Sequence, residues 1–131
     1  MLPQTIPLFP LPNVVLFPNI FLPLHIFESR YREMVTDALA GDRILGMVLL
    51  QPGYGADYEG RPPVYPIGCA GVITHAAPLD DGRFNIVLRG TERFRILGEN
   101  DSKAYRLARV REDLGTHPRV FYLLPKRSTQ S

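Results

Sequence analysis

Six prolines fall within the first 24 residues, and this stretch contains no charged side chain. An uncharged apolar run at the start of a chain can indicate a signal peptide or a membrane span. Proline removes a backbone donor and fixes φ, so a continuous spanning helix cannot form through this segment. The basic region and the small-residue cleavage site of a signal peptide are also missing. We therefore expect extended chain that enters a fold, in a cytoplasmic protein without a membrane partner.

Proline and glycine are frequent along the whole chain, which has thirteen and eleven of them in 131 residues. Such frequent interruption favours many short elements joined by turns over a few long helices. The length suits one domain with one core, and 45% apolar residues exclude disorder of the whole chain. We expect a domain over residues 1–115 and a carboxyl-terminal extension over 116–131.

Hydrophobic periodicity predicts one helix, from about Glu28 to Ala40, followed by a stop at Gly41. Extended segments are predicted at residues 6–9, 14–17, 21–24, 44–50, 67–75, 84–89, 93–96 and 105–111, with residues 120–124 as a further strand or a docking segment. Asp80-Asp81-Gly82 predicts a hairpin turn, and Gly90-Thr91 a second reversal. These elements favour a mainly β (α+β) fold, a small barrel of about six strands with one amphipathic helix.

The sequence lacks the usual signs of catalysis or cofactor binding. It has no Gly-Lys pair for a phosphate loop and no Gly-x-Ser-x-Gly elbow. Its three histidines are isolated from one another, without metal-ligand spacing. Cys69, the single cysteine, lies in an apolar run and is interpreted as a core residue. We therefore predict no enzyme activity, catalytic residue, cofactor or metal.

Two features suit binding instead. The long segment of residues 51–66 contains four prolines and three tyrosines, and aromatic side chains on loops are enriched at protein interfaces. The candidate contact residues are Tyr54, Tyr58 and Tyr65 from this segment, and Phe17 and Phe21 from the apolar start of the chain. The alternative for the phenylalanines is that they build the core.

Seven arginines lie between Arg83 and Arg111, which could form a face for phosphate groups. Glu92, Glu99 and Asp101 lie among them, so ion pairs on solvated strand faces are the favoured interpretation. Binding of nucleic acid is retained as the alternative function.

Several short motifs together resemble the amino-terminal substrate-binding domain of Lon (peptidase S16) proteases, in the form that stands alone in bacteria. They are Pro7-Leu8-Phe9-Pro10-Leu11, Val14-Val15-Leu16-Phe17-Pro18, Leu22 to Glu28 with Arg30-Tyr31-Arg32, Gly68 with Gly71-Val72-Ile73, Asp81-Gly82-Arg83, and Gly90 to Ile96. Their order and spacing over about residues 5–111 match the family. Ser29 replaces the proline that the family usually has, which should cost little at the start of a helix.

The resemblance implies a PUA-like pseudo-barrel of about six strands with one helix packed on it. It implies a non-catalytic module that recognises unfolded or tagged polypeptides, as an adaptor or regulator in proteolysis and protein quality control. A protease or chaperone is then a further candidate partner, and a homodimer is a further candidate assembly. PUA-like folds elsewhere bind RNA, so the fold alone leaves both functions open.

Overall fold

The computed structural model describes residues 2–52 and 61–114 and shows a mainly β fold with one helix. In chain order its elements are β1 (Thr5–Leu11), β2 (Phe21–Ile26), α1 (Ser29–Ala40), β3 (Ile44–Leu49), β4 (Ile67–Pro78), β5 (Phe84–Asn100) and β6 (Arg106–Glu112). This confirms the prediction of about six strands and one helix.

The strands form one sheet in the order β2-β5-β4-β3-β1-β6, and β6 pairs again with β5. That second pairing closes the last five strands into a barrel. β1 and β3 pair in parallel and every other pairing in the sheet is antiparallel. The parallel pair requires a crossover, and the chain between β1 and β3 supplies it through β2 and α1.

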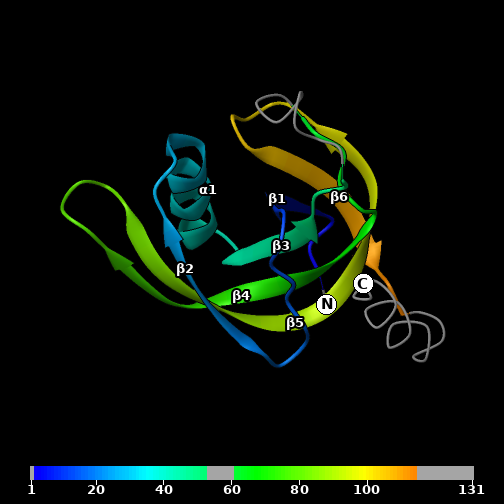
Figure 1. Ribbon diagram of the computed structural model, residues 1–131, viewed down its shortest axis with the longest axis horizontal. Coiled ribbons are helices and arrows are strands. Elements are labelled where there is room, and N and C mark those ends of the chain that lie inside the picture. The colour runs from blue at the N-terminus through cyan, green and yellow to red at the C-terminus, as the bar shows by residue number, and fades with distance from the viewer. Residues whose placement is uncertain (1, 53–60, 115–131) are drawn as a thin grey trace.

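β5 is the longest strand, and its two halves belong to two different parts of the sheet. Its first half pairs with β2 and with the end of β4, and its second half pairs with β6 and the start of β4. Residues 21–26, 72–78 and 84–89 therefore form a three-stranded extension of the barrel. Figure 1 shows the long β4–β5 hairpin reaching away from the barrel, with β2 beside it.

The buried residues form two hydrophobic clusters. The barrel interior is filled by Ile6, Leu8, Val48, Ala70, Phe94, Ala108 and Val110. Gly68 leaves room for the largest of these, because a Cβ on Gly68 would lie 2.8 Å from the Phe94 ring. The second cluster packs α1 against the sheet through Tyr31, Met34, Val35 and Ala38. There the rings of Tyr31 and Phe9 approach to 4.5 Å between centroids.

Local structure departs from the sequence prediction at two places. Residues 14–17 are irregular, although they were expected to be extended and strand-like. The chain does not reverse at Gly90-Thr91, because β5 continues without a break through both residues. The pairing register with β4 shifts there instead, between Cys69 and Gly71. The predicted turn at Asp80-Asp81-Gly82 is confirmed, with Gly82 at a φ of 91°.

The helix begins and ends close to the predicted positions. Glu28 is its N-cap residue, and the Glu28 carbonyl accepts hydrogen bonds from the Tyr31 and Arg32 amides. The helix ends at Gly41, whose φ of −125° is not left-handed. The left-handed residue lies two positions later, at Arg43, with a φ of 63°. α1 is too short to cross a bilayer, and the described residues contain no helix able to do so.

Candidate functional site

The segment between β1 and β2, residues 12–20, is fastened across the sheet by a few specific contacts. The Asn19 amide donates to the Gly90 carbonyl at 2.8 Å, and the Gly90 amide donates to the Ile20 carbonyl at 2.9 Å. The Ile20 amide in turn donates to the Phe17 carbonyl at 3.1 Å. Leu16 is buried, with 4% of its surface exposed. The segment is thus anchored by one apolar side chain and by backbone hydrogen bonds.

Large apolar side chains next to this anchor remain in solvent. The exposed fractions are 50% for Val15, 47% for Phe17, 52% for Ile20 and 59% for Phe21. Scattered exposed apolar residues are ordinary on a protein surface, but four within seven residues form a local concentration. We call these four residues the apolar segment. Leaving them in water forgoes hydrophobic stabilisation that a partner could provide.

The exposed face of the three-stranded extension also carries apolar side chains. Leu22, Leu88 and Ile73 are neighbours across β2, β5 and β4, and all three pack into the cluster under α1. Because side chains alternate along a strand, the next row lies on the opposite face. That row contains Phe21, Arg89 and Val72. One arginine thus stands between two apolar side chains.

Within the part of the chain that the structure describes, β2 lies at the end of the sheet and pairs only with β5, so its other edge has no strand partner there. The hydrogen bond from the Gly90 amide to the Ile20 carbonyl shows which residues of β2 direct their backbone groups toward β5. Even-numbered residues of β2 bond toward β5, and Phe21, Pro23 and His25 turn their backbone groups to the free edge. Pro23 therefore removes no ladder donor, which is the place that proline tolerates in a sheet.

The five predicted contact residues fall in different places. Phe17 and Phe21 belong to the apolar segment. Tyr65 is 42% exposed but lies beside β3, where its amide donates to the Leu49 carbonyl at 2.9 Å. Tyr54 and Tyr58 lie outside the described residues. Sequence reasoning missed Val15 and Ile20, although both lie in the uncharged opening stretch of the chain.

The comparisons with known proteins point to one family. Residues 5–128 match the model of the ATP-dependent protease La (LON) substrate-binding domain. The chain belongs to this family. A curated Lon protease of Desulfosudis oleivorans is 30% identical over 94 residues, which is 72% of this chain and 12% of that protein. The Lon protease of Flavobacterium johnsoniae is 29% identical over 111 residues, 85% of this chain and 14% of that protein.

Solved structures agree with this assignment. The Lon N-terminal domain protein from Xanthomonas campestris is 29% identical with a TM-score of 0.63, covering 82% of this chain and 59% of that one. The N-terminal domain of a Mycobacterium avium complex Lon protease has a TM-score of 0.64 at 16% identity, covering 97% of this chain and 71% of that one. The latter supports the fold alone. This chain spans less than a sixth of the curated Lon proteases that it matches.

Two side chains that could carry chemistry, Cys69 and Tyr105, lie in a packed cluster of this Lon substrate-binding domain. Burial raises the pKa of the Cys69 thiol from 9.0 to about 11, so the thiolate nucleophile is suppressed at neutral pH. The Tyr105 hydroxyl donates to Asp37 Oδ2 at 2.6 Å, and burial followed by this contact raises the pKa of Tyr105. Among the described residues, no three His, Cys, Asp or Glu side chains gather as metal ligands do.

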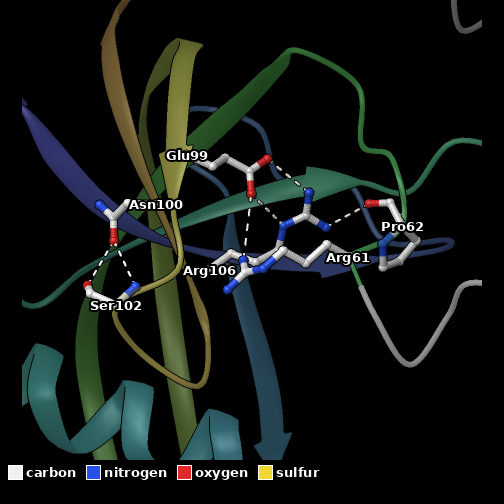
Figure 2. Close-up of polar contacts among 6 residues, drawn as sticks. All are labelled: Arg61, Pro62, Glu99, Asn100, Ser102 and Arg106. Carbon is white, nitrogen blue, oxygen red and sulfur yellow. Dashed lines mark hydrogen bonds and ion pairs between the residues drawn. The ribbon is translucent and has the colours of Figure 1, made fainter.

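One polar cluster of the domain is compact but is satisfied internally. Figure 2 shows Arg106 facing Glu99 across the β5–β6 hairpin, with hydrogen bonds of 2.8 and 2.9 Å to the two carboxylate oxygens. Arg106 also donates to the Pro62 carbonyl at 2.7 Å, and only 11% of its side chain is exposed. Arg61 approaches Glu99 at 3.9 Å. The cluster fastens the chain at residues 61–62 to the barrel end.

Proposed function

We propose that this Lon-type domain binds unfolded polypeptide through the apolar segment, so that its role is substrate recognition. The observation that carries the proposal is the contrast between Leu16 and its neighbours. Leu16 is buried, whereas Val15, Phe17, Ile20 and Phe21 are each about half exposed. Hydrophobic side chains that a folded protein would bury become available in an unfolded chain, and they are the natural partner for such a surface.

Recognition by this domain leaves unfolding and cleavage to ATPase and protease domains of the Lon type. A protease or chaperone that receives the bound polypeptide is then the further partner. We further propose that the protein is cytoplasmic and that the domain, residues 1–115, is not catalytic. Residues 116–131 are then a carboxyl-terminal extension of this domain. A homodimer would cover the same apolar side chains, so it would compete with polypeptide.

The test measures by calorimetry the affinity of the domain for a protein that has been reduced and alkylated and is therefore permanently unfolded. The double variant Phe17→Ser, Phe21→Ser removes the two rings from the apolar segment. Full burial of a large apolar side chain contributes about 1.5–3 kcal/mol, so half-exposed rings should contribute about 1 kcal/mol each. Together they predict a loss of affinity of about thirtyfold.

Phe27→Ser is the matched control, because Phe27 is also 59% exposed but lies beyond the other end of β2. It should leave affinity nearly unchanged. Equal losses in the control and in the double variant would overturn the assignment of the surface. Absence of binding by the wild-type domain up to about 1 mM polypeptide would overturn the function itself. Gel filtration over a range of concentrations shows whether the domain forms a homodimer, and so whether a homodimer competes with the polypeptide for the apolar segment.

A further inference from the structure

Two arginines face each other on the outer wall of the barrel. Arg95 on β5 and Arg111 on β6 are direct partners in the antiparallel register. Their neighbours Phe94 and Val110 point into the barrel interior. Because side chains alternate, Arg95 and Arg111 project outward, and so does Arg109, two residues before Arg111. Arg109 lies between Gly98 of β5 and Thr5 of β1.

These three guanidinium groups have no carboxylate partner within the described ranges, 2–52 and 61–114. Arg111 donates one hydrogen bond of 3.4 Å to the backbone carbonyl of Glu112. By contrast, Arg83 pairs with Asp81 at 2.7 Å and Arg106 pairs with Glu99 at 2.8 Å.

Placing like charges directly opposite each other destabilises a sheet. Arg95 and Arg111 stand in that relation, about 5 Å apart at their Cβ atoms by the usual geometry of such pairs. An anion bound between them would convert the repulsion into two charge-assisted hydrogen bonds, and the forked guanidinium matches a carboxylate in shape. The arrangement is thus more favourable with an acidic ligand than without one.

The surroundings favour acidic polypeptide over nucleic acid. Arg109 and Arg111 are two residues apart on one strand, so their spacing of about 6.8 Å equals the same-side repeat of an extended polypeptide. Leu97, 44% exposed, follows Arg95 on the same face and offers apolar contact. Single-stranded nucleic acid is usually held by stacking on aromatic rings. The phenylalanines of β5, Phe84 and Phe94, belong to the packed clusters, and β6 has none.

We propose that Arg95, Arg109 and Arg111 form a second binding surface, which takes an extended acidic stretch of polypeptide. It is separate from the apolar segment, and it selects for charge where the apolar segment selects for hydrophobicity. A polypeptide that contains both kinds of sequence would be held at two points of the same domain. The two surfaces can fail independently, because they share no residue.

The experiment uses the full chain and a synthetic peptide of alternating Glu and Thr, with alternating Gln and Thr as the uncharged match. The acidic peptide should bind, more weakly as salt rises, and the uncharged peptide should not. Arg95→Gln with Arg111→Gln should weaken binding by at least about tenfold, as expected for loss of charged hydrogen bonds. Arg30→Gln is the control, because Arg30 is on the helix and is already paired with Glu28 at 3.3 Å. This variant should not weaken binding of the acidic peptide.

Arg111→Glu separates binding from folding, because it places an opposite charge across from Arg95. This variant should melt no lower than the wild type and yet lose the acidic peptide. The surface is overturned if the Gln peptide binds equally well, or if the double variant binds like the wild type. It is also overturned if oligouridylate binds more tightly than the acidic peptide, since the ligand class is then nucleic acid.

Discussion

Gly90 on β5 lies directly opposite Gly71 on β4, and Leu16 packs over this pair of glycines. A Cβ added to Gly71 would lie 2.9 Å from Leu16 Cδ2, and one added to Gly90 would lie 3.2 Å from Leu16 Cγ. The missing side chains therefore create the space that Leu16 fills. This contact holds the apolar segment against the sheet while its neighbouring side chains stay in solvent.

Gly90→Ala is expected to release the apolar segment. The added methyl group would overlap the Phe17 carbonyl oxygen, which is backbone and must move to make room. Overpacking of this kind typically costs about 1–3 kcal/mol. Urea unfolding should show that loss, and affinity for the unfolded polypeptide should fall with it. Gly98→Ala is the control on the same strand, because its nearest neighbour would be the end of the Arg109 side chain at 3.4 Å.

Leu16→Ala tests the anchor from the other side. Removing a buried leucine side chain usually costs about 2–5 kcal/mol, less where the site can collapse. We expect a value near 2 kcal/mol, because an irregular surface segment can relax more than a strand. Chemical denaturation measures the loss. Val15→Ala, with Val15 half exposed beside it, should cost under about 0.5 kcal/mol, and equal costs for the two would contradict the anchoring role.

Arg106→Ala is expected to destabilise the domain by about 2 kcal/mol, because it removes charge-assisted bonds to Glu99 and leaves the Pro62 carbonyl without its donor. Arg106→Lys should recover only part of this, since an ammonium cannot make the forked contact. Arg61→Ala is the comparison, because its contact with the same carboxylate is 3.9 Å and solvent-exposed. Its cost should be under about 0.5 kcal/mol. Thermal unfolding of the three variants ranks them.

The elements that local pattern determines were predictable from the sequence. The helix followed from apolar residues at helical spacing, and the turn at Asp80-Asp81-Gly82 from residues that accept positive φ. Gly90-Thr91 was interpreted as a reversal because glycine often marks turns. The structure shows a different cause for Gly90, which is close approach of another backbone. Such a contact between distant segments has no signature in the neighbouring residues.

The candidate site was only partly predictable for a related reason. Phe17 and Phe21 were expected on the basis of an apolar opening stretch, but the same stretch also supplies core residues such as Phe9 and Leu16. The burial of Leu16 depends on the glycine pair of β4 and β5, which lies more than fifty residues after it in the sequence. Similarly, the direct pairing of Arg95 with Arg111 can be recognised only when the register of β5 and β6 is known.

Cys69 should make the domain less stable as the pH rises above neutrality. Burial raises the pKa of its thiol from 9.0 to about 11. Between these values the unfolded chain has lost the thiol proton and the folded chain retains it. The free energy of unfolding therefore decreases with rising pH across this window, by about 3 kcal/mol at most for this group. Tyr105 contributes in the same direction, because its pKa is also raised.

Urea titrations at about pH 8 and about pH 10.5 measure this decrease in the wild type and in Cys69→Ala. The variant loses some packing at both pH values, but its stability should fall less between them. Cys69→Ser is unsuitable because a buried hydroxyl introduces a new polar group. Tyr105→Phe provides the parallel comparison for the second group, and it also removes the bond to Asp37. An identical decrease in the wild type and in Cys69→Ala would show that the thiol is accessible to solvent in the folded domain, against its position in the packed cluster between α1 and the sheet.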